Sequence, residues 1–261
     1  MNIYLNAGLE AAKEAGEFLM SKFGKVESVS SKDRNDILTE ADLGAEEIIL
    51  RRLKVQFPEH CFFSEEAGYE GYAHSDYLWI IDPLDGTVNY TAGLELFSVS
   101  IGLAHKGQAV MGIVYAPLQG EMYSAVAGEG AFLNNTRISV SQNDILSDSI
   151  INIGLSCHYN NEQFNLSLMI CDRTAKLTRG VRIFESGALT ACYIACGRMD
   201  GKISVKTDPF SNTSGTVIIQ EAGGKVSDFE GRGWSMAMKN IVCSNRAVHR
   251  EIMEAVIYEC S

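Results

Sequence analysis

The sequence lacks the long apolar runs that mark membrane and exported proteins. Its apolar stretches all fall short of the roughly 18 residues that a membrane-spanning helix needs. The segment from Met1 to Leu5 has neither the basic start nor the continuous apolar run of a signal peptide. We therefore expect a cytoplasmic protein without a membrane partner.

Cysteine and proline are also used in ways that exclude several classes. The seven cysteines include no Cys-x-x-Cys pair and no Cys/His metal spacing, and an odd, scattered set is typical of reduced thiols. Only four prolines and no low-complexity segment occur among 261 residues, which argues against long disordered linkers.

Basic residues are in deficit, with 22 Lys and Arg against 33 Asp and Glu and a net charge of −11. Nucleic acids are bound through clustered Lys and Arg, so we expect no nucleic-acid partner. An acidic protein also repels a phosphate ester, so a site that binds one needs a locally positive electrostatic potential. Bound divalent cations supply such a potential.

The apolar pattern predicts an α+β fold. Helical spacing runs from Leu5 to Phe23 and from Ala45 to Phe57, whereas three segments between residues 97 and 126 alternate as antiparallel strands do. Helices followed by a meander are not repeated βαβ units. We predict an N-terminal α+β lobe over residues 1–140 and a C-terminal α/β lobe over residues 141–261.

The chemistry centres on the segment Asp82-Pro83-Leu84-Asp85-Gly86-Thr87. An apolar run, 77–81, predicts a buried strand that ends where the carboxylates begin, and the Pro-containing turn can direct Asp82 and Asp85 into one cavity. The amides and hydroxyl of Gly86 and Thr87 suit an anion. Hard carboxylate oxygens beside an anion-binding turn indicate Mg²⁺ and a phosphate. The alternative is an Asp-rich turn that caps a helix.

Further carboxylates lie upstream. Glu65 and Glu66 follow a short apolar run, and Asp42 falls in the first turn of a helix that Thr39 is placed to cap. The helix dipole favours a carboxylate there, so a purely structural role for Asp42 stays open.

These segments resemble the inositol monophosphatase family, Mg²⁺-dependent and Li⁺-sensitive phosphatases of the fructose-1,6-bisphosphatase-like superfamily. Gly112-Ile113-Val114-Tyr115-Ala116-Pro117 and Glu221-Ala222-Gly223-Gly224 also match, in family order. The resemblance implies a layered αβαβα sugar-phosphatase fold, in which the first lobe carries the metal site and the second completes the substrate pocket. It also suggests a homodimer.

The resemblance further implies roles for individual residues. It makes Glu65, Asp82, Asp85 and the Leu84 carbonyl ligands of one or two Mg²⁺ ions, and it places Thr87 and Glu65 on the attacking water with Asp42 behind them. It assigns substrate binding to Asp85, Gly86, Thr87, Glu185, Ser186 and Ser211.

The sequence departs from the family at three of its expected positions. Ser211 stands where the family has a second-metal aspartate, which predicts weaker binding of a second ion. Asp208, three residues away, is the candidate replacement. Ser204 stands where inositol-specific members carry glutamate, and Glu185 where they carry a small residue. A sugar phosphate or another small polyol phosphate is therefore as good a substrate candidate as inositol phosphate.

Two functions remain open from the sequence. The first is a working Mg²⁺-dependent phosphomonoesterase with direct attack by water, since no residue is placed as a covalent nucleophile. The second is a degenerate family member that binds a phosphorylated ligand or partner with little turnover because Ser211 replaces the aspartate.

Overall fold

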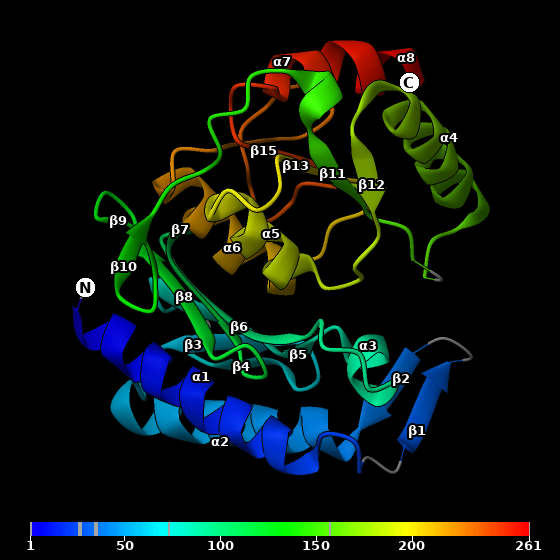
Figure 1. Ribbon diagram of the computed structural model, residues 1–261. Helices are drawn as coiled ribbons and strands as arrows, with labels where there is room; N and C mark the ends of the chain where they lie inside the picture. Colours follow the sequence, from blue (N-terminus) through cyan, green and yellow to red (C-terminus); the bar gives the residue numbers. More distant parts are fainter. Residues whose placement is uncertain (1, 26–27, 34–35, 73, 157, 261) are drawn as a thin grey trace.

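The computed structural model describes residues 2–25, 28–33, 36–72, 74–156 and 158–260, and it stacks them in alternating layers of helices and sheets (Figure 1). The helices are α1 (Asn2–Lys22), α2 (Glu40–Gln56), α3 (Thr87–Thr91), α4 (Asn161–Leu177), α5 (Gly187–Ala195), α6 (Pro209–Glu221), α7 (His249–Ile252) and α8 (Tyr258–Cys260), with a 3-10 turn η1 (Leu146–Asp148) and a π turn η2 (Met253–Ile257).

The strands form an eight-stranded sheet, a five-stranded sheet and a separate hairpin. They are β1 (Ser28–Asp33), β2 (Asp36–Thr39), β3 (Cys61–Ser64), β4 (Gly68–Gly71), β5 (Tyr77–Asp85), β6 (Ser98–His105), β7 (Gln108–Ala116), β8 (Glu121–Val126), β9 (Gly130–Leu133), β10 (Thr136–Ile138), β11 (Ile150–Ile153), β12 (Gly180–Arg182), β13 (Gly201–Ser204), β14 (Lys225–Ser227) and β15 (Ile241–Ser244).

The eight-stranded sheet has the order β10-β9-β8-β7-β6-β5-β3-β4. Its pairs are antiparallel apart from β3 and β5, which run parallel. Helices α1 and α2 cover one face of this sheet (Figure 1). The residues Ala7, Ala11, Ala15 and Leu19 recur every fourth position of α1 and are buried, so they form the apolar stripe that faces the sheet.

Helices α5 and α6 lie between the two sheets (Figure 1). Helix α6 approaches β7 closely because Gly112 has no side chain: a Cβ there would lie 2.2 Å from the Ser214 carbonyl oxygen. The Ser100 and Ser214 hydroxyls are 2.6 Å apart across the same contact. The α6 backbone is thus held directly on the first sheet.

The five-stranded sheet has the order β12-β11-β13-β15-β14. Strand β11 is parallel to β12 and β13, whereas β15 is antiparallel to its neighbours. Helices α4, α7 and α8 cover its outer side (Figure 1). The predicted α+β class and αβαβα layering are therefore confirmed.

The chain leaves the first sheet after β10 and enters the second at β11, close to residue 140. Helices α5 and α6 contact strands of both sheets, so one core cluster contains Val114 of β7 together with Cys243 of β15. The division into lobes at residues 1–140 and 141–261 stays a prediction.

The prediction that the strand ends at residue 81 is wrong. Strand β5 continues to Asp85, and its pairing with β6 shifts register between Asp82 and Asp85. A bulge accommodates Pro83, which has no N–H to donate to the neighbouring strand. The two carboxylates thus stand on a bulged strand and not on a turn.

Two sequence predictions about the chain as a whole can be compared with this structure. No helix of the described ranges is long and apolar enough to cross a bilayer. The six cysteines in those ranges are free thiols, while Cys157 lies outside the described residues.

Candidate active site

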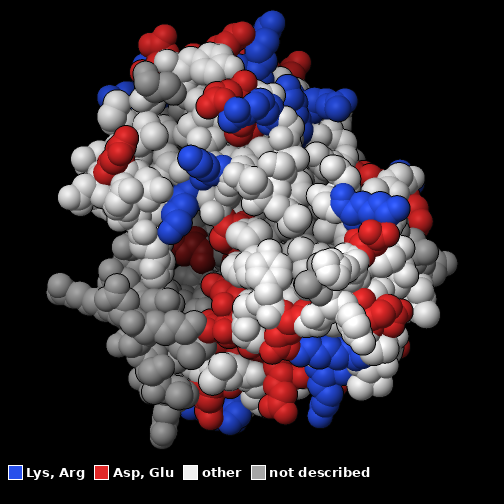
Figure 2. Space-filling view, turned by 180° about the vertical axis from the view of Figure 1, so that it is seen from behind, with Lys and Arg blue, Asp and Glu red and all other residues white. Residues whose placement is uncertain are grey.

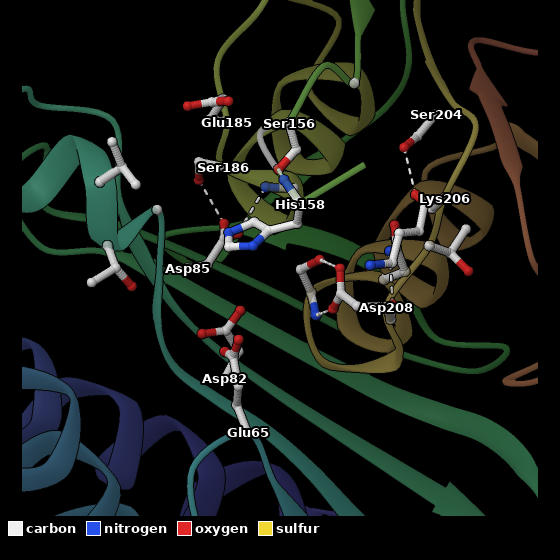
Figure 3. Close-up of a pocket in the computed structure, with 18 of the residues that line it drawn as sticks. Glu65, Asp82, Asp85, Ser156, His158, Glu185, Ser186, Ser204, Lys206 and Asp208 are labelled. Atoms are coloured by element: carbon white, nitrogen blue, oxygen red, sulfur yellow. Dashed lines mark hydrogen bonds between the residues drawn. The ribbon is translucent and has the colours of Figure 1, made fainter. Parts of the chain in front are cut away.

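Glu65 and Asp82 lie together because β3 ends where it is paired with the middle of the parallel strand β5. Ser64 of β3 is in register with Ile81 of β5, and the Glu65 amide donates to the Ile81 carbonyl at 3.1 Å. The next residue of each strand is a carboxylate, so the Glu65 and Asp82 side chains meet at the sheet edge (Figure 3). Parallel pairing thus brings together residues that are far apart in the sequence.

This juxtaposition perturbs both carboxyl groups. Burial raises the pKa of Asp82 well above its ordinary value, and repulsion from Glu65, Asp85 and Asp208 adds to the effect. Burial followed by repulsion from Asp208 raises the pKa of Glu65 to about 8. Carboxylates at this density need a proton or a cation between them.

The donor set fits Mg²⁺. Glu65, Asp82 and the Leu84 carbonyl are hard oxygen donors lining one cleft. Within the described parts of the chain, no three His, Cys, Asp or Glu side chains converge into a complete metal cage. Mg²⁺ does not need one, because it keeps several waters and is commonly bound by one or two carboxylates plus a substrate phosphate.

Thr87 and Asp42 form a pair beside these donors. The Thr87 Oγ1 lies 3.1 Å from Asp42 Oδ1 and 3.0 Å from the Leu84 carbonyl oxygen. The other Asp42 oxygen, Oδ2, accepts from the Thr39 amide and hydroxyl, which makes the capping box of α2. Burial raises the pKa of Asp42. The capping role of Asp42 is therefore real and coexists with its contact to Thr87.

Gly86 allows the chain to turn from β5 into α3. Its φ of 96° lies in the left-handed region, and a Cβ there would lie 2.7 Å from the Leu96 carbonyl oxygen. Both facts exclude a side chain at this position. The turn places Thr87 at the first position of α3.

Asp85 is bound to the N-terminus of α5 (Figure 3). Its Oδ1 accepts from the Gly187 amide at 2.7 Å, and its Oδ2 accepts from the Ser186 hydroxyl at 2.5 Å and the Ala188 amide at 3.0 Å. The Ser98 hydroxyl donates to Oδ2 at 3.1 Å. Asp85 thus ties the first sheet to the helix layer while it lines the cleft.

Asp208 caps α6. Its Oδ1 accepts from the Ser211 amide and its Oδ2 from the Ser211 hydroxyl, both at 2.8 Å. The carboxylate nevertheless lies close enough to Glu65 and Asp82 to raise the pKa of both. The Asp208 and Ser211 pair that the sequence singled out is therefore at the cleft, with its oxygens directed at the helix.

Glu185 has an unusual backbone conformation for its residue type. Its φ of 48° lies in the left-handed region, and its side chain is exposed at the cleft. The preceding residue is held on both sides: the Asn89 amide group donates to the Phe184 carbonyl at 2.7 Å, and the Asn152 oxygen accepts from the Phe184 amide at 3.1 Å. The surroundings thus impose a conformation that glycine adopts without strain.

The sequence analysis missed Glu46 and Lys202. Glu46 is 5% exposed, and its Oε1 accepts from the Ser64 hydroxyl and the Glu66 and Ala67 amides, so it fixes the turn that carries Glu65. A signal for Glu46 existed, because it lies one helical turn after Asp42 on the same face. Lys202 was detectable as a lone charge in an apolar strand.

All these groups surround a single cleft of about 410 Å³ between the two sheets. The predicted residues that line it are Glu65, Asp82, Leu84, Asp85, Gly86, Thr87, Glu185, Ser186, Asp208 and Ser211. Asp42 stands behind Thr87. Figure 2 shows a hollow with acidic side chains inside it and basic side chains on its rim.

Known proteins are similar to this chain in sequence and in fold. The family model described as the inositol monophosphatase family matches residues 3–260. A Thermotoga maritima protein named fructose-1,6-bisphosphatase/inositol-1-monophosphatase is 34% identical over 253 residues, which cover 97% of this chain and 95% of the relative. A Neisseria meningitidis protein named putative Nus factor SuhB is 34% identical over 258 residues, 98% of each chain.

The solved structures agree. The extragenic suppressor protein SuhB from Bartonella henselae superposes with a TM-score of 0.92 at 32% identity, covering 97% of this chain and 98% of that one. The segments that led to the resemblance are thus part of a likeness over the full length. The chain belongs to the inositol monophosphatase family.

Proposed function

We propose that this protein is a Mg²⁺-dependent phosphomonoesterase that hydrolyses a small polyol or sugar phosphate. The observation that carries the proposal is the meeting of Glu65, just after β3, with Asp82 of β5, next to the Thr87 and Asp42 pair. Neighbouring carboxyl groups whose pKa values are both raised are suited to a divalent cation, and the adjacent hydroxyl is suited to hold a water.

Particular groups of the chain would bind the ion. Glu65, Asp82 and the Leu84 carbonyl would hold the ion, and Asp85 and Asp208 are the further carboxylates that the family resemblance offers as candidate metal ligands. When bound, Mg²⁺ neutralises phosphate charge and lowers the pKa of water.

The Thr87 hydroxyl, which donates to Asp42 Oδ1, would accept a hydrogen bond from the attacking water and pass its proton toward Asp42. One P–O bond forms to that water oxygen as the ester P–O bond breaks, and the leaving alkoxide takes a proton from solvent. The amides of Gly86 and Thr87 would hold the phosphate.

The cleft supports a small substrate. Its volume of about 410 Å³ lies in the usual range for small-molecule sites. Glu185 and Ser204 line it beside Ser186, so its substrate side differs from that implied for inositol-specific members. This favours a class of hydroxyl-rich phosphate substrates, which the cleft selects by hydrogen bonds, over inositol phosphate as the single substrate.

The test is phosphate release from a panel of polyol and sugar monophosphates across a Mg²⁺ titration. We expect Mg²⁺-dependent release, a loss of about 10²- to 10⁴-fold in Thr87→Ala, and loss of the Mg²⁺ response in Asp82→Asn. Glu47→Gln, an exposed change on α2, is the control. Phosphate release that does not depend on Mg²⁺, or that is unchanged in Asp82→Asn, would contradict the proposal.

The second candidate function, binding of a phosphorylated ligand or partner without turnover, is favoured by Ser211 at the position of the family aspartate. Relatives that carry the name Nus factor SuhB lie at the same identity as a relative named as a phosphatase. Thermal stabilisation by a panel member without any phosphate release would support this candidate.

A further inference from the structure

A lysine side chain is buried in the cleft without a carboxylate partner. Lys202, on β13, is 5% exposed, and its Nζ donates to the Gly187 carbonyl at 3.3 Å and to Asn212 Oδ1 at 3.2 Å. Both acceptors are neutral. Among the described residues, no carboxylate oxygen lies within 4.0 Å of this nitrogen. A buried cation that no carboxylate contacts directly is costly, so such a group is suited to a ligand that brings an anion into contact with it.

Lys202 lies beside the position that the family uses for its second metal ligand. A Cβ at Gly187 would be 2.7 Å from Ser211 Oγ and 3.2 Å from Lys202 Nζ, so the hydroxyl and the ammonium flank the same point. The ammonium also acts on Asp85: its attraction opposes the effect of burial on the pKa of that carboxyl.

The carboxylates that could hold a second ion are engaged elsewhere. Asp85 uses both oxygens on α5, and Asp208 uses both on Ser211. Asp85 Oδ1 and both Asp208 oxygens each accept one of these bonds and keep a further lone pair, but a divalent ion held there would lie close to a fixed positive charge.

We propose that the Lys202 ammonium takes the place of a second divalent ion and binds the substrate phosphate from the side of the second sheet. An ammonium has three donors, and neutral oxygens engage two of the Lys202 donors. The third is available to a phosphate oxygen, which lysine binds as a point charge. The inference rests on the proposed function only in requiring a phosphate ligand.

The experiment counts ions and measures phosphate binding without turnover. Mn²⁺ titrated into wild type, followed by calorimetry and by the signal of free Mn²⁺ in electron paramagnetic resonance, should give one ion per chain. Inorganic phosphate titrated into the Mn²⁺-loaded protein should bind about 10- to 100-fold more weakly to Lys202→Met. Lys206→Met removes an exposed charge at the same cleft and should change binding less than about 3-fold.

A second set of variants adds a carboxylate at position 211, with and without Lys202. Ser211→Asp should still bind one ion, because the new carboxylate pairs with the ammonium, whereas Lys202→Met with Ser211→Asp should bind two. Two ions in wild type or in Ser211→Asp alone would overturn the proposal, as would unchanged phosphate affinity in Lys202→Met. These readouts do not depend on hydrolysis, so failure of the proposed function would show separately, in the panel assay.

Discussion

Glu46 supports the turn that carries Glu65 in the proposed metal site, and its replacement tests how that site is built. One oxygen of this buried carboxylate accepts from the Ser64 hydroxyl and from the Glu66 and Ala67 amides, at 3.1 Å for each amide. These bonds hold the turn in which Glu65 stands. We predict that Glu46→Gln lowers stability modestly and that Glu46→Ala lowers it strongly.

The magnitude follows from the bonds lost. Hydrogen bonds to a charged acceptor contribute about 1.5–3 kcal/mol each, and exposure of the Ala67 residue reduces the cost at that amide. Glu46→Gln keeps one acceptor oxygen but loses the charge, so we expect a loss of about 1–1.5 kcal/mol. Glu46→Ala should lose about 3 kcal/mol, a fall in Tm of about 6–10 °C for a chain of this size.

The assay is thermal unfolding with and without saturating Mg²⁺, with Glu47→Gln as the matched control because Glu47 is the exposed neighbour on α2. A looser Glu65 turn should also shrink the stabilisation that Mg²⁺ adds, since a site that must be ordered first binds more weakly. If Glu46→Gln and Glu47→Gln melted together and responded equally to Mg²⁺, the positioning role of Glu46 would be refuted.

Two further predictions concern backbone strain and pH. Glu185→Gly should raise the free energy of unfolding by about 1 kcal/mol in denaturant, because the left-handed φ of 48° suits glycine. The same change should shift the relative rates across the substrate panel. A lower free energy of unfolding would contradict the strain argument. Burial lowers the pKa of His249 to about 4, so the unfolded chain binds a proton near pH 6.5 that the folded chain does not. The contribution of His249 to stability should therefore be full above pH 6.5 and fall by about 3 kcal/mol as the pH drops toward 4. His249→Gln should flatten that part of the curve and the exposed His74→Gln should not, in unfolding measured at several pH values.

The sequence by itself determined the local features, because these depend on residues a few positions apart. Thr39 and Asp42 cap α2 through bonds that span three residues, and the four-residue spacing of small side chains specifies the buried stripe of α1. The segments that resemble the family also hold residues that line the cleft. The bulge that carries β5 on to Asp85 was missed, because a proline that reads as a turn can equally sit in a strand bulge when a neighbouring strand is present.

Only the tertiary structure decided what these residues do to one another. The meeting of Glu65 with Asp82 requires the parallel register of β3 and β5, and the surroundings of Lys202 come from α5 and α6, the helices on either side of β13 in the sequence. Burial and charge density are sums over such long-range neighbours. The sequence can mark Lys202 as a lone charge in an apolar strand, but only the packing of the surrounding elements makes it a buried charge that lines the cleft.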